Sequence, residues 1–195
     1  MSHIGKFSLL VLFFSSISLF AQQNSKNELA IVQREDWNAQ EPIMEMKVHK
    51  PKFITIHHTG MPQKPELSIE KKLQALQNFS QKDSPMADGS IKKAWADVPY
   101  HFYIATNGEI AEGREIKFQG DSNTNYNLDG HVLIVVEGDF NKEKVLPQQW
   151  ESLKELISYI SGEYGISRNT ISGHRDQAET SCPGSNLYQK LPQLR

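Results

Sequence analysis

The amino-acid sequence predicts a single domain of the α/β or α+β class, in which helices pack against a central β-sheet. Short β-rich runs at 52–60, 100–115 and 131–140 are mixed along the chain with helical periodicity at 66–81 and 146–165. Such a mixture is typical of layered folds built around one sheet. No internal repeat or low-complexity tract divides these segments, and 195 residues are enough to bury one sizeable core.

The first 21 residues have the pattern of a secretory signal peptide. Lys6 precedes a run of apolar and small residues, Phe7–Phe20, and Ala21 supplies a small residue at the expected cleavage site. The run is shorter than the roughly 20 apolar residues of a membrane span, and an uncleaved anchor is the alternative interpretation. Because no cysteine immediately follows the run, a lipoprotein anchor is excluded. We therefore expect an exported protein, either periplasmic or secreted.

The composition is that of an ordinary globular protein. The chain carries a formal net charge of −2 and 38% hydrophobic residues. This balance lacks the basic patch typical of nucleic-acid-binding proteins and the polybasic segment typical of membrane-surface contacts. After a signal peptide over 1–21, we expect a flexible polar segment over 22–30 and the functional domain over 31–195. The mature protein is expected to be a monomer without a membrane span.

Three segments have the residue pattern of β-strands. The run 52–60 is β-rich and closes on a glycine, which predicts a buried strand. In 100–115, two strand-like runs flank Asn107 and Gly108, a pair strongly associated with β-hairpin turns. The run 131–140 is almost continuously apolar and predicts a central strand covered on both faces.

Two segments have the apolar spacing of α-helices. Pro147 suits the first turn of the segment 146–165, and Gly165 suits its end. Its apolar stripe, which we assign to core packing, consists of Trp150, Leu153, Ile157, Ile160 and Tyr164. In the segment 66–81, the positions at helical spacing are Leu73, Leu76 and Phe79 or Ser80.

The only cysteine of the chain, Cys182, lies in one short stretch with His174. His57 and His58 end the strand predicted at 52–60, where a side chain can reach a cleft. Imidazole nitrogen and thiolate are ligands of zinc, and a catalytic zinc site keeps three protein ligands and one open position. A metal ligand would also explain why an exported protein keeps one thiol without a disulfide partner. The alternative for Cys182 is an inert, buried small hydrophobe.

The choice between the two adjacent histidines depends on strand alternation, because neighbouring side chains point to opposite faces. His57 shares its face with two threonines, Thr55 and Thr59, whereas His58 shares its face with isoleucines. The polar face is the better candidate for opening onto a site. We therefore predict His57 as the ligand and His58 as a packed or supporting residue.

Four motifs then occur in a defined order: QREDWNAQEP at 33–42, ITIHHTG at 54–60, WADVPYHFYIATNGEIAEGRE at 95–115 and GHRDQAETSCPG at 173–184. Together they resemble the zinc-dependent N-acetylmuramoyl-L-alanine amidases of the type 2 class, which share their fold with peptidoglycan recognition proteins. The resemblance extends from about Val32 to Leu191. Each motif alone is weak, but four in the family's order are specific.

The resemblance implies an α/β fold with a central mixed β-sheet, packing helices and a zinc-containing surface groove. It implies Zn²⁺ as cofactor, with the metal ligands His57, His174 and Cys182 and the catalytic residues Tyr100 and Thr180. It implies cleavage of the amide between N-acetylmuramic acid and L-alanine, so the expected partners are peptidoglycan or muropeptides. Zinc lowers the pKa of a bound water to about 7, and Tyr100 would hydrogen-bond the attacking water or the developing oxyanion.

The sequence also departs from the family pattern. Thr180 stands where some phage members have lysine, and Val135 stands where a cytosolic branch has glutamate. Many relatives carry a histidine in the segment corresponding to 119–127, where Ser122 falls nearest here. The 81–99 link is longer than expected between a helix and a hairpin. It is either a lid or specificity loop or a surface insertion.

Two other functions compete with hydrolysis by zinc. The first is a module that binds peptidoglycan without cutting it; non-catalytic relatives typically lose a zinc ligand, whereas Cys182 is present here. The second is a cysteine hydrolase that uses Cys182 as nucleophile and His174 as base. No activating helix N-terminus is predicted beside Cys182, which favours the ligand role.

Overall fold

The computed structural model describes Met1 and residues 29–86 and 89–195. The expected signal peptide and almost all of the expected 22–30 segment therefore lie outside the described residues. Within the described part of the chain, no helix has the length and apolar character needed to cross a membrane.

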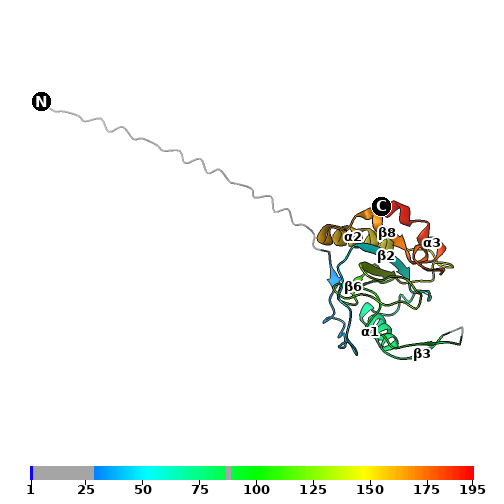
Figure 1. Ribbon diagram of the computed structural model, residues 1–195. Coiled ribbons are helices and arrows are strands. Elements are labelled where there is room, and N and C mark those ends of the chain that lie inside the picture. The colour runs from blue at the N-terminus through cyan, green and yellow to red at the C-terminus, as the bar shows by residue number, and fades with distance from the viewer. Residues whose placement is uncertain (2–28, 87–88) are drawn as a thin grey trace.

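A mixed six-stranded sheet forms the centre of the domain (Figure 1). Its strand order is β1-β6-β5-β7-β2-β8. The strands are β1 (Ile31–Val32), β2 (Phe53–His58), β5 (Phe102–Ile104), β6 (Ile110–Glu112), β7 (His131–Val136) and β8 (Ile171–Gly173). The β5–β6 pair is antiparallel and all other neighbours are parallel. The predicted α/β class with a central mixed sheet is confirmed.

The strands predicted from apolar runs occupy the middle of this sheet. β7 pairs with β5 on one side and β2 on the other, and all its residues are buried. This is the environment in which a continuous apolar run is expected. The predicted hairpin is also present: Ala105 donates its N–H to Glu109 O at 2.9 Å, and Gly108 in the turn has a φ of +90°.

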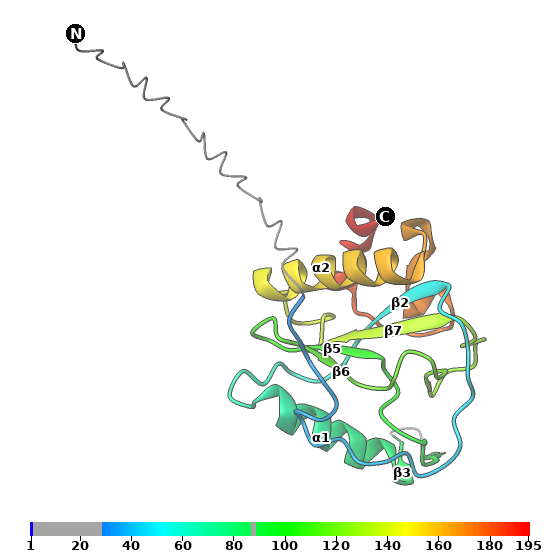
Figure 2. The same ribbon diagram turned by 90° about the vertical axis from the view of Figure 1, so that its left-hand side faces the viewer.

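Two long helices cover opposite faces of the sheet, α1 (Ile69–Ser80) and α2 (Pro147–Tyr164), as Figure 2 shows. α2 ends at Gly165, whose φ of +64° is left-handed, as the sequence predicted. The shorter helical elements are α3 (Ser185–Tyr188) and the 3₁₀ turns η1 (Arg168–Thr170), η2 (His174–Asp176) and η3 (Leu191–Leu194).

Each face of the sheet carries its own apolar cluster. On the α2 side, Ile54, Ile56 and Ile134 meet a helix face formed by Trp150, Leu153, Leu156, Ile157 and Ile160. On the α1 side, the cluster comprises Trp37, Ile69, Leu73, Val98, Tyr103, Ala105, Ala111 and Val135, with Val32, Ala39, Leu76 and Tyr100 packed against it. Among the described residues, this second cluster includes none from β2 or β8. That end of the α1 face is therefore free for other side chains.

Two positions of the predicted helix stripes are not in the core. Phe79 is 48% exposed, because the buried face of α1 runs through Leu73, Gln77 and Ser80 and leaves position 79 outside it. The Lys92 ammonium lies 5.1 Å from the Phe79 ring. Tyr164 is 40% exposed, since it is the last residue of α2, where the helix ends. Leu156 contributes to the core in addition to the predicted stripe.

The long 81–99 link contains a small antiparallel ribbon, β3 (Ser84–Pro85) with β4 (Ile91–Lys92), on an arm that extends beyond α1 in Figure 1. The ammonium of Lys92 holds the base of the arm by donating to three backbone carbonyls, of Ser80, Lys82 and Lys93. It also lies 4.5 Å from the centre of the Trp95 indole. The arm is thus tied to the domain where Trp95 begins the return to the sheet.

Candidate metal centre

The pairing of β2 with β8 brings two distant histidines together. These strands are parallel, with Ile56 opposite Gly173, so His57 and His174 follow in register at the same edge of the sheet. Their ring centroids are 4.4 Å apart. Because α1 covers only the other half of this face, both imidazoles lie beside an open part of the sheet.

Cys182 reaches the same place from the loop after β8. Arg175 donates its backbone N–H to Cys182 O at 2.9 Å, which closes the loop. The thiol Sγ lies 3.6 Å from His57 Nδ1 and accepts the backbone N–H of His58 at 3.4 Å. His57, His174 and Cys182 each offer one ligand atom, and these atoms all lie within 4.8 Å of one another.

This arrangement fits zinc in both donor type and spacing. Tetrahedral zinc, with bonds of about 2.3 Å to sulfur and 2.0–2.1 Å to nitrogen, places those two ligand atoms about 3.6 Å apart. The distance between Cys182 Sγ and His57 Nδ1 has this value. Nδ1 is therefore the atom of His57 that this spacing assigns to the metal.

Burial keeps the side chains of all three candidate ligands neutral in the absence of a cation. It lowers the pKa of His57 well below its ordinary value, with a further contribution from His174, and lowers the pKa of His174 to about 4. It also raises the pKa of the Cys182 thiol to about 12. Neutral imidazoles present the lone pairs that a metal requires, whereas the thiol releases its proton when a cation binds.

His58 has a different environment from His57. Its side chain points to the α2 face, where it packs against Phe140 with ring centroids 6.2 Å apart. Its Nδ1 accepts the backbone N–H of Phe140 at 3.2 Å. The structure thus groups His57, and not His58, with His174 and Cys182, and His58 contributes its backbone N–H to the cysteine sulfur.

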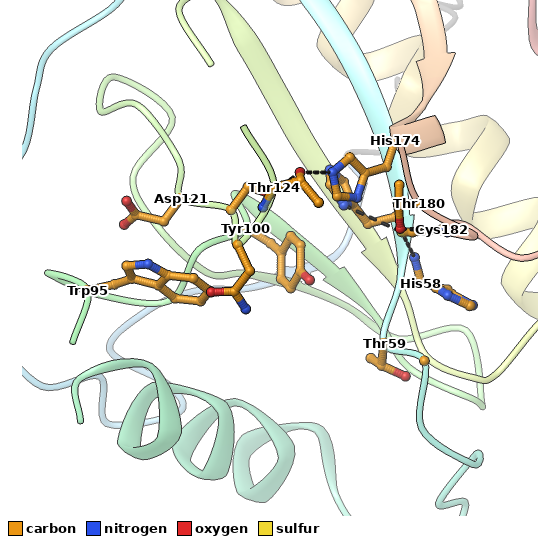
Figure 3. Close-up of a pocket in the computed structure, with 13 residues that line it drawn as sticks. His58, Thr59, Trp95, Tyr100, Asp121, Thr124, His174, Thr180 and Cys182 are labelled. Carbon is orange, nitrogen blue, oxygen red and sulfur yellow. Dashed lines mark hydrogen bonds between the residues drawn. The ribbon is translucent and has the colours of Figure 1, made fainter. Parts of the chain in front are cut away.

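The three residues open into a pocket of about 250 Å³, shown in Figure 3. Tyr100 lies beside His57, with ring centroids 5.2 Å apart. Burial raises the pKa of the Tyr100 phenol, and the nearby Cys182 and Tyr126 raise it further. The phenol therefore stays protonated at neutral pH. Trp95 and Asp121 lie on the side of Tyr100 away from His174 and Cys182.

A glycine allows the neighbouring chain to approach Tyr100 closely. A Cβ on Gly113 would collide with the carbonyl oxygen of Tyr100. Instead, Arg114 donates its backbone N–H to this oxygen at 2.8 Å. The close backbone contact between the start of β5 and the end of β6 therefore holds Tyr100 at the pocket.

Thr180 lines the pocket, and its hydroxyl oxygen accepts the backbone N–H of Cys182 at 3.2 Å. The predicted site residues His57, Tyr100, His174, Thr180 and Cys182 all line this one pocket. Sequence reasoning missed Thr124, whose Oγ1 lies 2.6 Å from His174 Nε2. Thr124 lies two residues after Ser122, the position nearest to where many relatives carry a histidine. No sequence pattern predicts its contact with His174, because this contact depends on how an irregular segment crosses the site.

Comparison with known proteins identifies the family of this chain. The family model described as N-acetylmuramoyl-L-alanine amidase matches residues 47–185. Peptidoglycan-recognition protein SD of Drosophila simulans is 27% identical over 86% of this chain and 87% of its own. The amidase LysC of Clostridium intestinale has a similar structure, with a TM-score of 0.66 and 26% identity over 84% of this chain and 95% of LysC.

A further solved structure contains a bound ligand. A mutant of Drosophila peptidoglycan recognition protein LB in complex with tracheal cytotoxin has a TM-score of 0.66 and 28% identity, over 83% of this chain and 92% of that one. The fold, the order of the motifs and the extent of the family match lead to one assignment. The chain belongs to the N-acetylmuramoyl-L-alanine amidase family.

Proposed function

We propose that this protein is a zinc-dependent hydrolase that cleaves the amide bond between N-acetylmuramic acid and L-alanine in peptidoglycan. The observation that carries the proposal is the convergence of His57, His174 and Cys182 in the pocket that also contains Tyr100. The family assignment supports the substrate class, since relatives are named as amidases of this bond or as peptidoglycan recognition proteins. The substrate would be peptidoglycan or its soluble muropeptide fragments.

Each group in the pocket has its own role in the proposed reaction. Zinc bound by His57, His174 and Cys182 would supply a Lewis acid for the scissile carbonyl and a nucleophilic water at neutral pH. Tyr100, whose phenol stays protonated, donates a hydrogen bond to the oxygen on which negative charge develops. Thr180 accepts a hydrogen bond from Cys182 N, so its own hydroxyl proton is available to the substrate.

Recognition without cleavage is the competing function, because several relatives are named recognition proteins. The presence of Cys182 within the ligand group favours catalysis, since a protein that only binds peptidoglycan has no need for three converging metal ligands. The cysteine-hydrolase alternative is disfavoured by the thiol itself. With its pKa raised to about 12 by burial, Cys182 is not a thiolate at neutral pH unless a cation binds.

We also propose that the protein acts outside the cytoplasm as a monomer, in the periplasm or the medium. The pattern of residues 1–21 supports export, and the catalytic domain would then comprise residues 31–195. Peptidoglycan lies in these compartments, so the location agrees with the substrate.

The test is to purify the protein after export, measure bound zinc, and assay the release of stem peptide from muropeptides. We expect about one zinc per chain, release that stops after chelation, and recovery of release when zinc is restored. Release that survives complete removal of zinc would refute the proposed mechanism. Stoichiometric zinc without release from any muropeptide would favour the recognition function instead.

A further inference from the structure

A hydroxyl group from the segment between β6 and β7 contacts one of the metal-binding histidines. Thr124 Oγ1 lies 2.6 Å from Nε2 of His174. Figure 3 shows Thr124 and Cys182 on opposite sides of the His174 imidazole. Since Nε2 is occupied by this contact, Nδ1 is the nitrogen of His174 that is left for a metal.

The position of Thr124 is itself set by a second hydroxyl. Ser122 Oγ lies 2.8 Å from Thr124 Oγ1 and accepts the backbone N–H of Thr124 at 3.2 Å. A hydroxyl has one proton to donate and can accept two hydrogen bonds. Thr124 can therefore donate its proton to Ser122 while its oxygen accepts the N–H of His174. In this direction, Nδ1 of His174 carries the lone pair.

We propose that Thr124 is a positioning residue that selects the metal-binding tautomer of His174 and fixes the orientation of its ring. The proposal rests on the proposed function only in assigning a metal to His174; it requires no particular substrate. The opposite direction of the hydrogen bond, with Thr124 donating to Nε2, would leave the proton on Nδ1 and obstruct the metal. Ser122 Oγ already accepts the backbone N–H of Thr124 and can also accept its hydroxyl proton, which permits the productive direction.

The expected magnitude follows from the role of such partners in other metal sites. Removing the group that holds the second nitrogen of a histidine ligand typically weakens metal binding by about 10–100-fold. In Thr124→Val, a methyl group replaces the hydroxyl at nearly the same volume, so packing is kept and only the hydrogen bonds of the hydroxyl, to His174 and to Ser122, are lost. In Thr124→Ser, the hydroxyl is kept and the methyl group is lost.

The experiment measures the Zn²⁺ dissociation constant by competition with a chelator for the wild type and both variants of the full chain after export. The control is Thr170→Val, which removes a surface hydroxyl that donates to Ser167 O and does not line the pocket. We expect about 10–100-fold weaker binding for Thr124→Val. Thr124→Ser and the control should remain near the wild-type value. Cobalt-loaded Thr124→Val should also show altered ligand-field bands, because the His174 ring is no longer fixed.

Two results would overturn the assignment. One is unchanged zinc affinity in Thr124→Val, and the other is equal loss of affinity in Thr124→Ser, which would trace the effect to the methyl group. Thermal unfolding of the metal-free proteins checks that every variant is folded. Zinc binding by the wild type without peptide release would refute the amidase function and leave this assignment standing, so the two failures are distinguishable.

Discussion

The sharpest prediction concerns Tyr100→Phe, which removes one oxygen from the pocket. The ring of Tyr100 lies against His57 at 5.2 Å between centroids, and phenylalanine keeps this contact. Among the described residues, none forms a hydrogen bond with the phenol oxygen, so the substitution breaks no bond within this part of the protein. We therefore expect stability and zinc content to remain at their wild-type values.

The predicted effect falls on the rate of hydrolysis. Burial raises the pKa of the Tyr100 phenol, so the group remains a hydrogen-bond donor over the whole neutral range. Loss of one donor to a developing oxyanion typically lowers kcat by about 10²–10³-fold, or about 2.7–4 kcal/mol of transition-state stabilisation. KM should change much less, because the ground-state carbonyl carries little of the charge that this donor stabilises.

The assay compares kcat, KM and zinc content of Tyr100→Phe and wild type on one soluble muropeptide. A kcat within about threefold of the wild type would refute the role of the phenol as an oxyanion donor, whose loss should cost far more. Loss of zinc from Tyr100→Phe would also refute the reasoning, since it would show that the tyrosine supports the metal ligands rather than the reaction.

Two further predictions concern the metal ligands and the pH dependence of stability. Cys182→Ser and His57→Ala should each weaken zinc binding by more than about 100-fold, which exceeds the typical cost of losing a hydrogen-bond partner of a ligand. His58→Ala should retain zinc. Loss of zinc from His58→Ala but not from His57→Ala would contradict the ligand assignment. Buried His101 bonds through both ring nitrogens, and burial lowers its pKa from 6.5 to about 3. Between pH 6.5 and pH 3, His101 is therefore protonated in the unfolded chain but not in the folded chain. The free energy of unfolding should fall as pH falls, and His101 should account for about 2 kcal/mol of this loss at pH 5. Denaturant unfolding with a chelator at pH 7.5 and pH 5 should show a pH effect smaller by about this amount in His101→Gln, and an equal effect in both proteins would contradict the prediction.

The sequence by itself determined the local elements and the chemical types in the site. Continuous apolar character identified β7, helical spacing identified α2, and the Asn107–Gly108 pair identified the hairpin, because each depends on neighbours along the chain. Strand alternation also separated the two adjacent histidines. His58 packs on Phe140 at one face, and His57 points to the other.

Only the tertiary structure decided how these parts meet. The parallel register of Ile56 with Gly173 places His57 beside His174, and no local pattern specifies which residues of two distant strands become opposite one another. Burial of Ser80 rather than Phe79 likewise depends on which neighbours α1 meets in the folded chain. Thr124 is the clearest case: a threonine in an irregular segment carries no sequence signal. Its contact with His174 exists because the folded chain brings that segment over the end of the sheet that α1 leaves uncovered.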